Sequence, residues 1–385
     1  MTQKQFCTVD YLEIDPTTRC NFSCIYCYGR NIPARDLSWQ LFTKAIETFP
    51  NLKFVELHGE GEPLLHPLFF DMAAWLRSRD IKISVFTNGS LLDLKNVQKL
   101  MDTGFEKVVV SLDTVNPDRF KKIRGHDLYP VLEGILRLIS ERDAGNCSKP
   151  AIGIASTIFK DSLHDIPSLV YLCGVLALDG GIGYQPLNPA EYYSRYYSEE
   201  LKKQIAPLQL LDIAFQELSV DPSFKKSIEG YSLHRGFFDE LFEPLSHGIR
   251  CCPWIEQGSY VTASGYVTPC CMIKESDAIG RIGEIDASQV IEYKQQMKSV
   301  FSDGMIPNSC QNCEVAAIIL SLPGNVFEPL PALSAKLKLD LPAMRDEIAR
   351  WQTVLNIGVK FSDYVPSKKR SGVSQYNGQP SPENC

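Results

Sequence analysis

The stretch YLEIDPTTRCNFSCIYC, residues 11–27, joins a short β-rich run to three closely spaced cysteines. Tyr11 to Asp15 reads as a strand that ends at Pro16. Because Cys20, Cys24 and Cys27 follow at once, we expect one loop to bring three thiols to the carboxyl end of this strand. Three protein ligands leave a position open on a metal group for a small molecule, whereas a structural zinc loop would need a fourth ligand from elsewhere.

Five further β-rich runs follow, and amphipathic helical patterns separate them. This order predicts an α/β fold with a parallel sheet and right-handed crossovers, an open, partial (β/α)6 TIM-like barrel. In such barrels the functional residues lie at the carboxyl ends of the strands. The expected strands are Tyr11 to Asp15, Phe54 to His58, Lys82 to Thr87, Lys107 to Asp113, Ile152 to Ile158 and Gly183 to Pro186, and the expected helices are Ser38 to Thr48, Leu68 to Arg77, Val97 to Thr103, Val131 to Arg142 and Ile166 to Val175.

The pattern divides the chain into five parts. We expect the barrel at 8–190, a helical linker or lid at 191–249, a small cysteine-rich α+β module at 250–320, a helical segment at 321–365 and a flexible tail at 366–385.

The composition restricts the function classes. With 385 residues and 44% hydrophobic content the chain can bury a sizeable core. A net charge of -7 gives no basic surface for nucleic acid or an anionic membrane. We find no export signal and no apolar run that would span a membrane, so we expect a cytoplasmic protein. Thirteen cysteines in such a chain favour metal ligation over disulfides.

The first cysteine set resembles the signature of the radical S-adenosylmethionine (SAM) superfamily, with spacings of three and two residues and an aromatic, Tyr26, before the third cysteine. The resemblance implies a four-iron ([4Fe-4S]) cluster held by Cys20, Cys24 and Cys27, with SAM chelating the fourth iron. Reductive cleavage of SAM would then give a 5′-deoxyadenosyl radical that removes a hydrogen atom from a substrate.

Motifs at the ends of the next strands resemble the family's SAM-binding segments. Gly61-Glu62-Pro63 looks like its glycine-glutamate-proline motif, although Glu60 stands where many relatives have glycine. The resemblance implies that Asp113 binds the ribose of SAM and that Arg124 binds its carboxylate. A helix cap and a surface ion pair explain these two residues equally well. The SAM-binding residues that the resemblance implies are Tyr26, Gly61, Glu62, Thr87, Asn88, Ser111, Asp113, Arg124 and Gln185.

The second cysteine set comprises Cys252, Cys270, Cys310 and Cys313. We expect a hairpin, Val261 to Ala263 paired with Tyr266 to Thr268, to bring the first two together. Four thiols suit a structural zinc ion or a fully ligated cluster. The arrangement resembles the auxiliary-cluster module of radical SAM proteins, called SPASM, or twitch in its shorter form, which implies an auxiliary [4Fe-4S] cluster. Cys251 is an alternative to Cys252 as ligand.

Two cysteines flank this set. The resemblance makes Cys251 and Cys271 candidate thiol hydrogen donors, as in radical SAM epimerases; the alternative is that each is an inert small core residue. Cys271 occupies the position at which sulfatase-maturing relatives have an acidic residue.

Three functions follow. The leading one is an oxidoreductase, similar to dehydrogenases of aminocyclitols and to peptide-modifying enzymes, whose auxiliary cluster accepts an electron and whose reductant is a flavodoxin or ferredoxin. The first strand begins near Met1, so we expect no leader-binding domain here, which favours a small-molecule over a peptide substrate. The others are an epimerase and a non-catalytic metal-stabilised scaffold or electron carrier.

Overall fold

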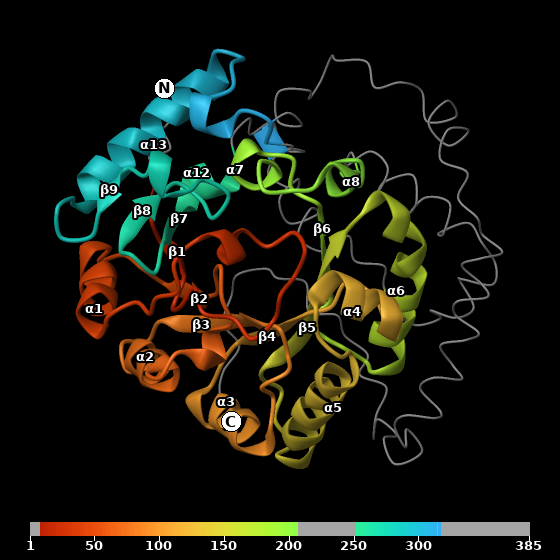
Figure 1. Cartoon of the computed structure of the whole chain (residues 1–385). Coiled ribbons are helices and arrows are strands. Elements are labelled where there is room, and N and C mark those ends of the chain that lie inside the picture. Colours follow the sequence, from red (N-terminus) through yellow and green to blue (C-terminus); the bar gives the residue numbers. More distant parts are fainter. Residues whose placement is uncertain (1–7, 207–251, 314, 317–385) are drawn as a thin grey trace.

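Six parallel strands form one curved sheet in the order of the sequence (Figure 1). The structure, a computed structural model, describes residues 8–206, 252–313 and 315–316. All six expected strands are confirmed with small shifts at their ends: β1 Tyr11–Ile14, β2 Phe54–Leu57, β3 Lys82–Thr87, β4 Lys107–Ser111, β5 Ala151–Ile158 and β6 Ile182–Pro186.

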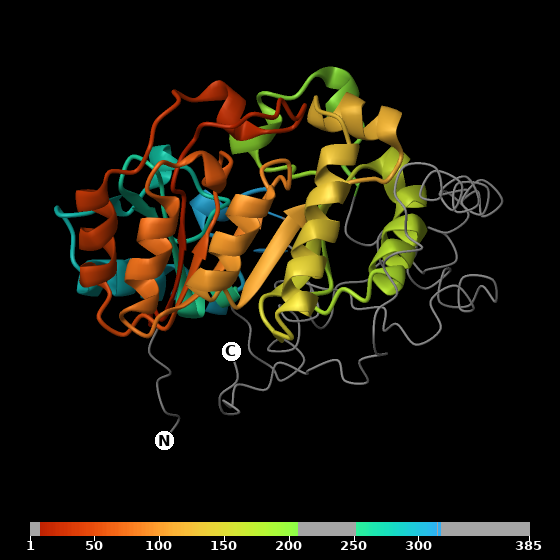
Figure 2. The same cartoon turned by 90° about the horizontal axis from the view of Figure 1, so that it is seen from below.

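The helices cover the outer face of this sheet, and Figure 2 shows them standing in a row. Ser38 and Asp93 cap the amino ends of α1 and α3 by accepting backbone N–H bonds, and Gly125 ends α4 in the left-handed conformation. The helices are α1 Trp39–Thr48, α2 Phe69–Arg77, α3 Leu94–Thr103, α4 Pro117–Arg124, α5 Tyr129–Ala144 and α6 Ile166–Val175; single 3₁₀ turns are η1 Tyr28–Asn31, η2 Pro63–Leu65 and η3 Lys160–Asp165.

The two faces of the first strands differ in chemistry. Leu12, Ile14, Val55 and Leu57 are fully buried in the core between sheet and helices. Their neighbours along the strands point to the opposite, inner face, because side chains alternate. On β1 and β2 this inner face carries Tyr11, Glu13, Phe54 and Glu56.

The cysteine-rich part continues the same sheet. β7 (Gly258–Val261) lies parallel to β1, and the antiparallel strands β8 (Tyr266–Thr268) and β9 (Gly280–Arg281) follow it. The expected hairpin is present, but its first strand ends at Val261 and does not reach Ala263, because the turn begins there and Gly265 takes a positive φ of 82°. Its other elements are α12 Pro253–Gln257, η4 Glu275–Asp277, α13 Ala287–Ser302 and η5 Asn308–Cys310.

The sheet does not close on itself among the described residues, since β6 and β9 form its two edges. The molecule is therefore an α/β protein with a mostly parallel central sheet. Of the expected linker, only α7 (Glu191–Ser194), α8 (Glu199–Lys202) and the residues up to 206 are described. The remainder of that segment, Cys251, and the expected parts at 321–365 and 366–385 lie outside the described residues. In the described ranges no helix is long and apolar enough to cross a membrane.

Candidate active site

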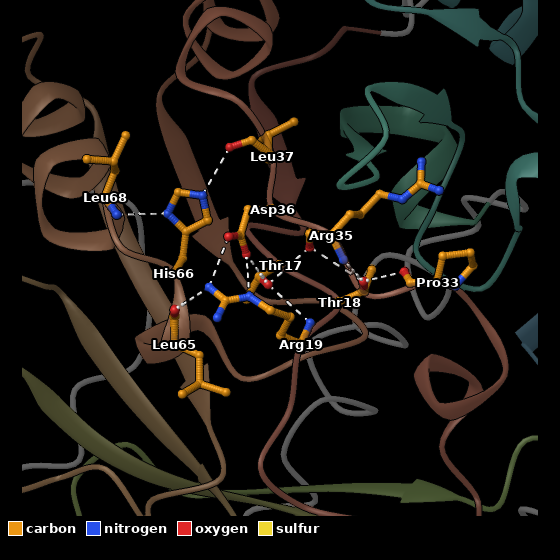
Figure 3. Close-up of polar contacts among 10 residues, drawn as sticks. All are labelled: Thr17, Thr18, Arg19, Pro33, Arg35, Asp36, Leu37, Leu65, His66 and Leu68. Atoms are coloured by element: carbon orange, nitrogen blue, oxygen red, sulfur yellow. Dashed lines mark hydrogen bonds and ion pairs between the residues drawn. The ribbon is translucent and has the colours of Figure 1, made fainter.

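A hydrogen-bond network clamps the two ends of the loop that carries the first cysteines (Figure 3). Thr17 Oγ1 donates to Asp36 Oδ1 at 2.6 Å, and Arg19 binds both carboxylate oxygens of Asp36 at 2.9 Å. Thr18 Oγ1 donates to the carbonyl of Pro33 and accepts from the N–H of Arg35. Burial opposes the charge on Asp36, but Arg19 and Thr17 hold the pKa of its carboxyl below the ordinary value. The cysteine loop is thus fixed at its base.

The same network reaches the loop after β2. Arg19 donates to the carbonyl of Leu65 at 2.7 Å, and His66 Nε2 lies 3.0 Å from the carbonyl of Leu37 (Figure 3). A Cβ at Gly61 would lie 2.1 Å from the Thr17 carbonyl oxygen, so only glycine allows these loops to pack this closely. The Gly61-Glu62-Pro63 segment therefore lies directly against the cysteine loop.

Cys20, Cys24 and Cys27 lie on this clamped loop, respectively exposed, buried and half-buried. Burial raises the pKa of all three thiols, that of Cys27 to about 12, and the neighbouring thiols act in the same direction on Cys24 and Cys27. No disulfide joins cysteines of the described residues. Without a cation the three thiols therefore stay neutral. A cationic metal group would stabilise their thiolate forms, so the three thiols are suitable ligands for it.

Glu62 is buried and holds the end of β3 against this loop. Its Oε1 accepts from Thr87 Oγ1 at 2.8 Å and from the N–H of Leu64, and its Oε2 accepts from the N–H of Asn88 at 2.6 Å. Burial raises the pKa of Glu62 to about 7. Asn88 in turn places Nδ2 3.8 Å from Cys20 Sγ. The expected residues Glu62, Thr87 and Asn88 therefore form one unit beside the first cysteine.

Asp113 and Arg124 form a buried ion pair. The Arg124 guanidinium binds both oxygens of Asp113, at 2.6 and 2.7 Å, and places Nη1 4.0 Å from Cys24 Sγ. Asp113 also accepts from Tyr26 Oη and from the N–H of Thr157. The pair is not at the surface, because Asp113 is fully buried and Arg124 is 6% exposed. Arg124 is bound to Asp113 rather than presented alone to a ligand.

Two other expected residues lie apart from this unit. Ser111 ends β4, half-buried, on the face opposite to the core residue Val110. Gln185 is exposed and contacts Met272 from the second cysteine region, with Nε2 3.9 Å from Sδ. The structure thus places Gln185 beside Met272 of the second cysteine region, whereas the resemblance implies that Gln185 binds SAM.

The second cysteine set gathers in a small apolar cluster. Burial raises the pKa of Cys252, and the thiols of Cys270 and Cys313 add to this effect. Burial and the thiol of Cys313 raise the pKa of Cys270 to about 12. Backbone N–H groups of the residues two and three positions later act in the opposite direction on both thiols. A cavity of about 60 Å³ opens beside them, and its lining includes Cys270, Cys310 and Cys313. Thiols with amide donors around a void are a donor set that fits a metal group.

Cys271 lies on the inner face of the barrel. Burial raises the pKa of its thiol, and the neighbouring Glu13 carboxylate acts in the same direction. Lys274 donates to the carbonyl of Cys271 at 2.8 Å and forms an ion pair with Glu60. Three tyrosine rings surround the Lys274 ammonium, with centroids 4.6 to 6.0 Å away.

Sequence reasoning missed the polar inner face of β1 and β2. His58 Nε2 lies 3.6 Å from Glu13 and 3.3 Å from Glu56. Burial opposes the charged imidazole, but the two carboxylates outweigh it and raise the pKa of His58 to about 9. The sequence does contain a signal for this face. Glu13 and Glu56 alternate with Leu12, Ile14, Val55 and Leu57, whereas the strands of a parallel sheet are normally apolar throughout.

Comparison with known proteins finds a family match in the N-terminal part of the chain. Residues 14–146, from the end of β1 to just beyond α5, match the sequence model of the Radical SAM superfamily. This is the superfamily whose cysteine signature the first cysteine set resembles, and its members bind SAM through a [4Fe-4S] cluster.

Curated relatives are similar over parts of the chain. A tungsten-containing aldehyde ferredoxin oxidoreductase cofactor-modifying protein of Pyrococcus furiosus is 28% identical over 57% of this chain and 64% of its own length. A GTP 3′,8-cyclase of Rhodopseudomonas palustris is 35% identical over 42% of the chain and 48% of its own. The chain thus spans less than two thirds of the length of these two relatives. A GTP 3′,8-cyclase of Aliarcobacter butzleri is 27% identical over 77% of this chain and 90% of its own length.

Solved structures share the fold. Streptococcus suis SuiB bound to the precursor peptide SuiA superposes with a TM-score of 0.60 at 15% identity, over 81% of this chain and 71% of that one. Native anSMEcpe with bound AdoMet and the Cp18Cys peptide gives a TM-score of 0.59 at 15% identity, over 91% of this chain and 99% of that one.

Proposed function

We propose that this chain is a radical SAM enzyme in which Cys20, Cys24 and Cys27 hold a [4Fe-4S] cluster that binds and reductively cleaves SAM. One observation supports this most: the clamped three-thiol loop lies directly against the unit of Glu62, Thr87 and Asn88. When bound, the cluster and SAM supply a 5′-deoxyadenosyl radical that removes a hydrogen atom from the substrate.

The chain's own residues position these groups. Gly61 lets the loop after β2 pack against the cysteine loop, and Glu62 holds Thr87 and Asn88 beside it. Ser111, Tyr26 and the Asp113–Arg124 pair complete the SAM side of the proposed site, and the positive charge of Arg124 lies next to Cys24. Gln185 remains a proposed SAM contact that needs to turn away from Met272.

For the second cysteine set we propose an auxiliary [4Fe-4S] cluster held by Cys252, Cys270, Cys310 and Cys313, in a SPASM- or twitch-like module. Their amide-donor pattern and the adjoining cavity support a bulky metal group. A structural zinc ion is the alternative, and metal analysis separates the two. With such a cluster to accept an electron, the reaction is an oxidation of the substrate, and a flavodoxin or ferredoxin is the proposed reductant.

The substrate proposed is a small aminocyclitol- or sugar-like molecule or a peptide. SuiB and anSMEcpe, which share the fold, are described with bound peptides. Relatives named GTP 3′,8-cyclase suggest a nucleotide instead. The inner face argues against a triphosphate, since Glu13, Glu56 and Glu60 would repel its negative charges.

An epimerase that uses Cys271 as hydrogen donor is the second candidate. The observation that favours it is the position of Cys271 on the inner face, against Glu13. Cys251, the other candidate donor, lies outside the described residues.

Anaerobic reconstitution with iron and sulfide tests the proposal. We expect about eight irons per chain from two four-iron clusters, and conversion of SAM to 5′-deoxyadenosine after reduction. Incubation with deuterated candidate substrates would then transfer deuterium to 5′-deoxyadenosine. A fully iron-loaded, reduced protein that leaves SAM intact would contradict the enzyme proposal and favour a metal-stabilised scaffold or electron carrier.

A further inference from the structure

The inner face at β1 and β2 carries more negative than positive charge. Four acidic side chains, Glu13, Asp15, Glu56 and Glu60, face two basic ones, His58 and Lys274. We call the group Glu13, Asp15, Glu56, His58 and Glu60 the acidic face. Lys274 pairs with Glu60, and His58 lies between Glu13 and Glu56, so four carboxyl groups share two basic side chains. Burial raises the pKa of Asp15 and of Glu56, and a bound cation would favour their ionised forms.

Three buried atoms of the acidic face lack a hydrogen-bond partner: two carboxylate oxygens and His58 Nε2. Glu13 Oε2 and Asp15 Oδ1 have no hydrogen-bond partner, although their residues are only 3% and 1% exposed. Asp15 adjoins Glu60, His58 and Lys274, so its free oxygen belongs to the same group. A buried carboxylate oxygen without a donor is costly, and a ligand with several donors and a positive charge would relieve it.

The chain already holds one ammonium in these surroundings. Lys274 Nζ is bound by Glu60, by the Cys271 carbonyl and by the faces of Tyr28, Tyr193 and Tyr260. Similar groups surround His58, whose ring contacts Phe86 and Tyr260. Carboxylates combined with aromatic faces suit organic cations.

We infer that the acidic face binds a positively charged ammonium or guanidinium group of the substrate. This inference rests on the proposed function, and it names the substrate class. The place is suitable, because the backbone oxygen of Glu60 lies 3.8 Å from Cys27 Sγ, at the edge of the proposed SAM site. Glu56, His58 and Glu60 are half-buried and form the side from which a ligand would enter.

A divalent metal ion is the competing occupant. Ligand atoms of Glu13, Glu56 and His58 lie within 4.8 Å of one another, as a metal ion requires. Because the two carboxylates raise the pKa of His58 to about 9, a metal ion would have to displace a proton from the imidazole, which weakens metal binding at neutral pH.

Ligand-observed saturation-transfer NMR on the full-length chain, without reductant, tests the inference. We expect n-butylammonium to bind and butyrate not to bind. Glu56→Gln should weaken n-butylammonium binding roughly tenfold, the effect of losing one charge-assisted hydrogen bond. Glu133→Gln, an exposed glutamate on α5, is the matched control and should change nothing.

Displacement experiments identify the kind of molecule that carries the cation, and other results would overturn the inference. Displacement of n-butylammonium by N-acetyl-lysine amide points to a peptide, and displacement by 4-aminocyclohexanol points to an aminocyclitol. Equal binding of butyrate, or binding of Mn²⁺ that displaces n-butylammonium and is lost in E56Q, would overturn the inference. If E56Q does not fold, the comparison of n-butylammonium with butyrate on the unaltered chain decides. Since no SAM cleavage is measured, these results are independent of the proposed function.

Discussion

Lys274 forms a buried ion pair with Glu60 and so connects the second cysteine region to the loop after β2. Each partner keeps the other's charge from being buried alone. Glu60 is joined through its backbone oxygen to Cys27, and Lys274 is bound to the carbonyl of Cys271. This single pair therefore links the surroundings of both cysteine sets.

Replacement of Lys274 by methionine should lower the free energy of unfolding by about 3 kcal/mol, because it leaves Glu60 buried without a partner. Urea unfolding of the metal-free chain measures this. The double variant Lys274→Met with Glu60→Gln should recover part of the loss.

The exposed pair of Lys202 and Glu199 offers a matched control, and Lys202→Met should change the free energy of unfolding far less than Lys274→Met. An equal effect of both lysine substitutions would show that the Lys274 pair contributes nothing beyond an exposed one.

Arg19→Ala should loosen the cysteine loop, since Arg19 alone joins Asp36 to the carbonyl of Leu65 among the contacts described. In the metal-free protein the thiols of Cys20, Cys24 and Cys27 should then react faster with a thiol reagent, and about four fewer irons should be retained after reconstitution. Arg79→Ala, which removes an exposed arginine that contacts only the Trp75 ring in the described part of the chain, is the control. Unchanged thiol reactivity in R19A would refute the clamp.

Glu62→Gln should change how stability depends on pH. The pKa of Glu62 is about 7 in the folded protein and near 4.5 in an unfolded chain, so the folded state keeps a proton that the unfolded state releases. Its favourable contribution is complete below pH 4.5 and is lost as the pH rises to 7, by roughly 3 kcal/mol.

Denaturant unfolding between pH 4.5 and 8 checks this. The amide of the E62Q variant does not titrate, so its free energy of unfolding should lack the decrease with pH that Glu62 causes. Glu133→Gln should keep the slope of the unaltered protein. A parallel pH dependence for E62Q and the unaltered chain would contradict the buried, proton-binding state of Glu62.

Cys271→Ala separates oxidation from epimerisation. If the chain oxidises its substrate, the variant should retain product formation, and turnover in D₂O should leave no solvent deuterium on the product carbon. Deuterium in the product, together with loss of turnover in C271A but intact SAM cleavage, would instead identify Cys271 as the hydrogen donor. Cys147→Ala, in the loop after α5, is the control for removal of a half-buried thiol.

The sequence predicted the barrel because its strands carry local signals. β3 and α6 have the bounds that the sequence predicts, since Asn88-Gly89 follow the strand and Pro167 lies in the first turn of the helix. The family resemblance named Glu62, Thr87 and Asn88, and their grouping agrees with the rule that carboxyl ends of parallel strands meet at one edge.

Contacts between distant segments could not be predicted. That Arg124 binds Asp113 with both oxygens, or that Trp254 donates to Glu13 across 241 positions, depends on how loops pack and not on local pattern. The same holds for Gln185, whose strand end points to Met272 because β7 to β9 bring the second cysteine region there.

The register of β7 on β1 has a consequence for how the molecule folds. β1 lies between β2 and β7, and Leu12 faces Ser259 across the ladder. A chain cut after residue 206 would lack β7, so the amide and carbonyl groups on one side of β1 would have no hydrogen-bond partners. Such an exposed strand edge pairs with strands of other chains. The cysteine-rich part should therefore not behave as an appendage: both parts should melt in a single calorimetric transition, and the shortened chain should aggregate.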